Sequence, residues 1–178
     1  MEKIHISFLH EDEIETLQHL AESIWRVCYK GMISPAQIDY MLNQRYQPDL
    51  LRERLSQGDL ILAARAGKRM VGFAHAYVND EGLCKLDKLY VSTSHQHRGI
   101  GSQLVHEVEA FARRQNCELV ILRVYKGNQP ALNAYRKYGF KLITEFREDI
   151  GNGFVMDDCV MGKAVLPIAK IARSSIDS

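Results

Sequence analysis

Residues 95–104 read HQHRGIGSQL and mark the point where the sequence pattern changes from strand to helix. The apolar run before them ends at Val91, and helical spacing begins after Gly101. The first amides of a helix lack hydrogen-bond partners and lie at the positive end of its dipole, so an anion can bind there. Glycine permits a tight turn and a close approach to the backbone. Gly99 and Gly101 therefore indicate either an anion-binding turn or a loop that the glycines only shape.

Two common phosphate-binding motifs do not fit this stretch. A P-loop requires Lys and then Ser or Thr after its second glycine, whereas Gly101 is followed by Ser102 and Gln103. The dinucleotide fingerprint requires a third glycine where Leu104 stands, and it opens a βαβ unit. Here three strand-like runs precede the turn, so the dinucleotide fingerprint fits this stretch poorly.

The rest of the chain alternates between strand-like and helix-like segments, with no linker, repeat or low-complexity tract. We expect strands over 4–8, 60–66, 69–78, 83–91, 118–125, 140–149 and 154–165. We expect helices over about 12–29, 35–46, 49–57 and 129–138, and one from Gly101 onward. The strand ELVILRVY (118–125) is expected to be buried on both faces. On the helix after Gly101, Glu109 and Arg113 are expected to form an exposed i,i+4 pair.

Length and charge limit the class of protein. A chain of 178 residues with 46% hydrophobic side chains is expected to form one domain, residues 1–166, followed by a loose tail, residues 167–178. The net charge of +1 gives no reason to expect a nucleic-acid or membrane partner. No apolar stretch approaches the ~20 residues that span a bilayer, and the start does not resemble a signal peptide. These features favour a cytoplasmic protein with a small-molecule partner.

The sequence gives no sign of a metal site. His95, His97 and His106 are not expected to form one, because only one of them lies on the strand side that could approach a carboxylate cluster. The cysteines are scattered without a CxxC pair, and each lies in an apolar run, so we interpret them as core residues. They are Cys28, Cys84, Cys117 and Cys159.

Two motifs together point to one family. The pattern Q-x-x-G-x-G from Gln96 to Gly101 resembles the acyl-CoA-binding signature of the GNAT superfamily of N-acetyltransferases. The pattern N-x-x-A-x-x-x-Y-x-x-x-G-F from Asn128 to Phe140 is similar to that family's other cofactor segment. The resemblance extends over roughly Ile4 to Val165. It implies an α/β fold of GNAT type, with a central mixed sheet flanked by helices in one domain. The ending NGFVMDDCVM (152–161) is similar to bacterial members that act on small amines such as polyamines.

The resemblance implies a binding site for acetyl-CoA. The pyrophosphate is expected against the backbone amides of 97–102, where Arg98 can add charge. The pantetheine arm is expected in a cleft where the strand ending at Val91 separates from the strand ending at Tyr125. Asn128 is expected to bind that arm or to cap the helix that follows it, and the two roles are compatible. The implied cofactor-binding residues are Leu89, Tyr90, Val91, Gln96, His97, Arg98, Gly99, Ile100, Gly101, Ser102, Asn128 and Tyr135.

The resemblance also implies catalytic groups. A primary amine has a pKa of about 10.4, so its neutral form costs roughly 4.6 kcal/mol at pH 7. Asp87 stands where relatives carry an acidic residue that takes the amine proton through water, although it could instead pair with Lys85 or Lys88 on an exposed face. Tyr135 is in the position of the family's usual proton donor to the departing thiolate, although its ring could equally be ordinary packing.

The acceptor site is the least defined part of the resemblance. Trp25, Tyr29 and Tyr40 on the first two helices are candidates to line it, and aromatic residues there also suit a core. Asp157 and Asp158 could attract a cationic amine or form a solvated face.

The function predicted from the sequence is transfer of acetyl from acetyl-CoA to a primary amine of a small molecule, by direct attack in a ternary complex. The alternatives are an acyl-CoA sensor without turnover and an enzyme that acetylates protein N-termini or lysines. A homodimer is left open.

Overall fold

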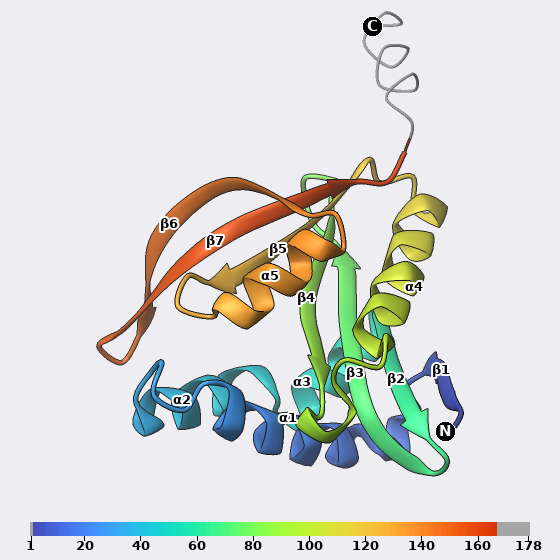
Figure 1. The fold of residues 1–178 in the computed structure, drawn as a ribbon, viewed down its shortest axis with the longest axis horizontal. Coiled ribbons are helices and arrows are strands. Elements are labelled where there is room, and N and C mark those ends of the chain that lie inside the picture. The colour runs from blue at the N-terminus through green and yellow to red at the C-terminus, as the bar shows by residue number, and fades with distance from the viewer. Residues whose placement is uncertain (1, 167–178) are drawn as a thin grey trace, which may run out of the picture.

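The computed structural model describes residues 2–166 and shows one α/β domain with a seven-stranded mixed sheet (Figure 1). Every expected strand and helix is present. The elements are β1 (Ile4–Phe8), η1 (Glu11–Glu13), α1 (Ile14–Cys28), α2 (Pro35–Arg45), α3 (Pro48–Ser56), β2 (Leu60–Ala66), β3 (Arg69–Val78), β4 (Cys84–Val91), η2 (Thr93–His95), α4 (Ile100–Arg114), β5 (Leu119–Tyr125), α5 (Gln129–Lys137), β6 (Lys141–Gly151) and β7 (Phe154–Ala164). The tail expected over 167–178 lies outside the described residues.

The strand order is β1-β2-β3-β4-β5-β7-β6, and β4 with β5 is the parallel pair of this otherwise antiparallel sheet. That pairing is short. It joins Cys84–Leu86 to Val120–Leu122 and stops there, although β4 continues to Val91 and β5 to Tyr125. The two strands therefore separate in the middle of the sheet.

A β-bulge in β4 lies at the point of separation. His75 on β3 pairs with Lys88, and Ala76 pairs with Leu86, so Asp87 is an extra residue without a partner on β3. A bulge bends its strand and increases the local twist. Asp87 thus stands where β4 turns away from β5.

Helices cover both faces of the sheet and enclose two apolar clusters. One cluster lies between the sheet and α4 with α5, and it includes Leu104, Val108 and Leu132. The other lies between the sheet and α1–α3, and it includes Trp25 and Tyr46. Burial of these apolar faces is the main driving force for the fold.

The cysteines fit the core interpretation in the described structure. All four are free, and three of them are buried, while Cys28 is partly exposed.

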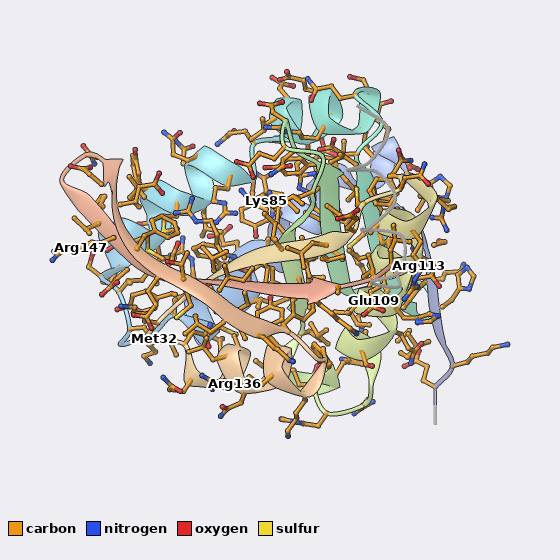
Figure 2. All side chains as sticks on the ribbon, turned by 90° about the horizontal axis from the view of Figure 1, so that it is seen from above. Met32, Lys85, Glu109, Arg113, Arg136 and Arg147 are labelled. Carbon is orange, nitrogen blue, oxygen red and sulfur yellow. The ribbon has the colours of Figure 1, made fainter. Side chains whose placement is uncertain are left out.

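Two local expectations from the sequence were wrong. Strand β5 is not buried on both faces, because Arg123 is exposed and only alternate residues are buried. The Glu109–Arg113 pair exists on α4 (Figure 2), but Glu109 is buried and also binds Lys163 from β7. Glu109 therefore pairs with both Arg113 and Lys163 in a partly buried network. The spacing of residues within α4 could not indicate the contact with a lysine on β7.

The β6–β7 hairpin bends away from the rest of the sheet, and its tip lies near α2 (Figure 1). Two hydrogen bonds fasten it there. The hydroxyl of Tyr40 donates to the carbonyl oxygen of Ile150 at 2.8 Å, and Nε2 of Gln37 donates to the carbonyl oxygen of Val155 at 3.1 Å. Helix α2 and the hairpin together close one end of the space left by the separated strands.

Candidate functional site

A cavity of about 890 Å³ occupies the space between the separated strands, α1, α2, α5 and the β6–β7 hairpin. It brings together most of the residues singled out in the sequence. The predicted residues that line it are Trp25, Tyr29, Tyr40, Asp87, Leu89, Tyr90, Val91, Gln96, His97, Gly99, Ile100, Gly101, Asn128 and Tyr135. Arg98 and Ser102 are exposed beside it and do not contribute to its wall.

The glycine turn forms one end of the cavity. Gly99 is the N-cap of α4, in the left-handed conformation with φ +78°, and His97 two residues earlier has φ +61°. Left-handed residues near a helix start turn successive amides toward one side and make a concave anion site. Nε2 of Gln96 donates to the carbonyl oxygen of Val91 at 3.1 Å, which ties the turn to the end of β4.

Gly101 lies close to a side chain from another element. A Cβ atom added there would lie 2.5 Å from the hydroxyl oxygen of Tyr138. Tyr138 of the segment after α5 therefore packs against the first turn of α4, a contact that the sequence analysis missed.

Asn128 has the capping role predicted as one of its two alternatives. Its Oδ1 accepts a hydrogen bond from the amide of Ala131 at 3.2 Å, and Pro130 follows in the first turn of α5. Proline there fits a position without an intrahelical N–H partner. The cap holds Asn128 at the cavity wall next to the end of β5.

Tyr135 lies on the cavity-facing side of α5. Its ring packs edge-to-face against Phe140, with the ring centroids 5.8 Å apart, and against Tyr138 at 6.4 Å. Burial raises the pKa of the Tyr135 phenol above its ordinary value. The hydroxyl therefore keeps its proton throughout the neutral range and can act as a donor into the cavity.

The three aromatic residues predicted for the acceptor site differ in position. Trp25 is almost wholly buried, and its Nε1 donates to the hydroxyl of Tyr46, so it also acts as core. The hydroxyl of Tyr29 lies 3.4 Å from that of Tyr90, across the cavity wall between α1 and β4. Tyr40 both lines the cavity and holds the hairpin.

Asp87 is largely buried, and it pairs with more than one cationic side chain. Its carboxylate lies 2.5 Å from Nζ of Lys88, 3.2 Å from Nη2 of Arg45 and 3.6 Å from Nζ of Lys85. Burial alone would raise the pKa of Asp87, but its neighbour His75 and the charges of Lys88 and Arg45 outweigh this and hold the pKa well below its usual value. Asp87 is therefore an anion at any pH at which the protein is expected to work.

A second carboxylate, Asp158 on β7, points into the same cavity. Its side chain is 10% exposed, and Oδ2 forms an ion pair with Nη2 of Arg123 at 3.3 Å. Oδ1 is buried and has no hydrogen-bond partner among the described residues. Burial raises the pKa of Asp158, and the charge of Arg123 opposes this only in part. A buried carboxylate oxygen without a partner is costly, so it is well suited to a cationic or N–H donor ligand.

Glu148 on β6 also lines this end of the cavity and pairs with Arg123. Of the charged residues at this end, Asp158 was a candidate from the sequence, whereas Glu148, Arg123 and Arg45 were not predicted. Asp157, by contrast, is half exposed and pairs with Lys126 outside the cavity.

Within residues 2–166, no three His, Cys, Asp or Glu side chains are grouped so that they could hold a metal ion. No helix in that range is long and apolar enough to cross a membrane.

Comparison with known proteins gives a consistent result. The model of the family described as "Acetyltransferase (GNAT) family" matches residues 17–140. A spermidine N(1)-acetyltransferase from Thermoplasma acidophilum is 25% identical over 159 residues, which is 86% of this chain and 96% of that protein.

Solved structures agree with this. The PaiA N-acetyltransferase from Thermoplasma acidophilum, crystallised with coenzyme A, matches with a TM-score of 0.77 and 27% identity over 91% of this chain and 99% of that one. A GCN5-related N-acetyltransferase from Rhodopseudomonas palustris matches with a TM-score of 0.78 over 92% of this chain and 97% of that one, and at 20% identity it supports the fold alone.

Proposed function

Because the GNAT acetyltransferase family model matches most of this chain, the chain belongs to that family of acetyl-CoA-dependent N-acetyltransferases, and we propose that it acetylates a primary amine of a small molecule. The observation that carries the acceptor part is that Asp158 lines the cavity and that its buried Oδ1 has no hydrogen-bond partner among the described residues. The spermidine N(1)-acetyltransferase that resembles this chain acts on such an amine, which supports the same substrate class.

The cofactor half of the proposal rests on the glycine turn and the separated strands. In this proposal the amides of 97–102 bind the pyrophosphate. The backbone of Leu89–Val91 lies on the side of β4 that no longer pairs with β5, so it has hydrogen-bonding groups for the amides of the pantetheine arm. An amide near Tyr90 or Val91 can then polarise the thioester carbonyl as an oxyanion site.

The proposed reaction is direct transfer in a ternary complex. The acceptor ammonium loses a proton toward Asp87, through water, and the resulting amine attacks the thioester carbonyl carbon. The C–N bond forms as the carbonyl becomes an oxyanion, and the C–S bond breaks when the carbonyl is restored. The sulfur of coenzyme A leaves as a thiolate and takes a proton from Tyr135.

The first prediction concerns the cofactor turn. Gly99→Val should weaken acetyl-CoA binding by about 10-fold or more, because a side chain in a left-handed conformation disturbs the amides that hold the pyrophosphate. Calorimetric titration with acetyl-CoA measures this.

Gly82→Val is the matched control. Gly82 also has a positive φ, +74°, and no atom lies within 4 Å of the position that a Cβ would take. It lies in the β3–β4 turn and does not line the cavity. Both variants should lose similar stability, but only Gly99→Val should lose affinity. Equal affinities for acetyl-CoA in two folded variants would remove the turn from the cofactor site.

The second prediction concerns Asp158 and tests the function itself. Acetyl-CoA consumption by the wild-type protein should be stimulated by amines in a screen that includes monoamines, polyamines, amino acids, aminoglycosides and peptides. With the best acceptor, Asp158→Asn should raise KM for the amine by about 10- to 100-fold, the cost of losing one charged hydrogen bond, and leave KM for acetyl-CoA nearly unchanged.

Asp157→Asn on the same strand is the control, because Asp157 is half exposed and outside the cavity. It should behave like the wild type. Binding of acetyl-CoA without turnover on any amine would favour the sensor, and turnover confined to peptides would favour a protein acetyltransferase. Unchanged amine KM in Asp158→Asn would exclude Asp158 from the acceptor site.

A further inference from the structure

Asp87 stands between two cavities. A second cavity of about 190 Å³ is lined by residues of α2, α3, β3 and β4, and Asp87 and Arg45 belong to the walls of both. His75 and Lys88 line only the second one. The carboxylate at the acceptor site is therefore connected to a separate opening on the other side of β4.

A continuous chain of polar contacts begins at Asp87. Nζ of Lys88 lies 2.5 Å from Oδ2 of Asp87 and 3.4 Å from Nδ1 of His75, and Nδ1 itself lies 3.6 Å from that carboxylate. Nε2 of His75 lies 2.6 Å from Oδ2 of Asp59. Since Lys88 has only protons to donate, Nδ1 is the acceptor of this contact and Nε2–H donates to Asp59.

The chain is buried. His75 is 2% exposed and Lys88 is 6% exposed. Burying a histidine, a lysine and two carboxylates together is costly unless each is paired, and replacement by apolar side chains would often be neutral or stabilising. The arrangement therefore does not follow from stability.

We propose that His75, held by Asp59, takes up the proton that the acceptor amine gives to Asp87 and releases it to solvent through the second cavity. This rests on the proposed acetyl transfer. As Asp87 passes the proton to Nζ of Lys88, Lys88 passes one of its own protons to Nδ1 of His75. Asp87 is again a carboxylate, Lys88 is again an ammonium, and His75 is an imidazolium. Loss of the Nδ1 proton to solvent restores the neutral ring with its Nε2–H on Asp59.

Charged groups from several elements surround His75. The carboxylates of Asp59 and Asp87 and the ammonium of Lys88 lie against its ring. The ring of Tyr77 lies next to His75, with the centroids 5.7 Å apart. Arg54 from α3 and Lys85 from β4 lie over that tyrosine ring, and Arg45 from α2 lines the same cavity. Because Asp87 is held as an anion, a proton given to it is passed on rather than kept.

The experiment uses the full-length chain with its best acceptor. His75→Gln keeps a hydrogen-bonding side chain but cannot hold the proton, so kcat at pH 7 should fall by about 10- to 100-fold while KM for both substrates stays the same. The deficit should shrink as the pH approaches the pKa of the amine, about 10.4, because the neutral amine then forms without help. An acceptor of lower basicity should show a smaller deficit at pH 7. In His75→Ala, added imidazole should restore part of kcat.

His106→Gln on α4 is the matched control, because His106 is exposed and lines neither cavity. It should retain the wild-type pH profile. A wild-type pH profile in folded His75→Gln would overturn the proposal. A deficit that is constant with pH and acceptor, without imidazole rescue in His75→Ala, would also overturn it, since that is the behaviour of a purely structural residue. A wild-type protein that acetylates no amine would instead overturn the proposed function.

Discussion

Tyr135→Phe is expected to lower turnover by about 10²- to 10⁴-fold with little change in acetyl-CoA affinity. The substitution removes one oxygen and preserves the ring that packs against Phe140 and Tyr138. If the phenol supplies the proton to the departing thiolate, that interaction exists only as the C–S bond breaks. The loss should therefore appear in kcat.

The raised pKa of Tyr135 determines the pH dependence that we expect for turnover. Burial keeps the phenol protonated, so loss of its own proton cannot limit the rate near neutral pH. The wild-type profile at pH 6–9 should show no ionisation of this residue, and the phenylalanine variant should show the same shape at a lower level.

Tyr135→Ala gives the complementary measurement, because loss of a packed aromatic ring costs about 3–5 kcal/mol in a full core. Near-normal turnover in Tyr135→Phe, with an acceptor for which chemistry limits the rate, would leave Tyr135 with a packing role alone.

Asp87→Asn is expected to impair both activity and stability. Turnover should fall by about 10²-fold or more if Asp87 receives the amine proton. The variant also leaves Lys88 and Arg45 without their shared anion, and breaking a buried pair in this way costs about 3–5 kcal/mol. Urea unfolding measures the stability, and steady-state kinetics below the melting temperature measure the turnover.

The pH dependence of that stability difference has a definite sign. The pKa of Asp87 is lower in the folded state than in the unfolded state, so the charged form stabilises the fold. The difference between wild type and Asp87→Asn should be complete above the unfolded pKa of about 3.9 and should disappear as the pH falls through the lower folded value. It should thus be the same at pH 7 and pH 5.5.

Asp157→Asn again provides the control. Its pair with Lys126 is half exposed, and such pairs contribute about 0–1 kcal/mol. If Asp87→Asn were as active and as stable as Asp157→Asn, Asp87 would be neither the proton acceptor nor the centre of the buried network.

The parts of the fold that the sequence predicted well are those set by local patterns. Periodicity located the helices and strands, and the glycines at 99 and 101 located the start of α4. The pattern failed for β5, because an apolar run does not distinguish a face covered by protein from a face that lines a cavity, and only Arg123 broke the run.

The candidate site also has one part that local motifs predicted and one part that they did not. Most of the residues that the family resemblance implies for the cofactor lie on two contiguous motifs, so a match to those motifs was enough to name them. The acceptor half combines α1, α2, β4 and the β6–β7 hairpin, so residues such as Arg45 and Glu148 carry no local signal. The same holds for the contact of Asp59 with His75, which joins a loop to the interior of β3.

The face that each side chain of β4 occupies depends on how many residues separate the two parts of the strand. Before the bulge, Cys84 and Leu86 face the apolar cluster under α4, whereas after it Leu89 and Val91 do. Cys84 and Leu89 are an odd number of residues apart and yet both face this cluster, so the extra residue at Asp87 reconciles the two parts of the strand with the alternation of side chains. Deleting or adding one residue between Cys84 and Leu89 would make that spacing even, so the strand could run without a bulge while Cys84 and Leu89 keep their present face. Straightening the strand without such a change would instead turn Lys88 toward the apolar layer. Chain length at this position thus decides whether β4 carries a bulge at the point where it leaves β5.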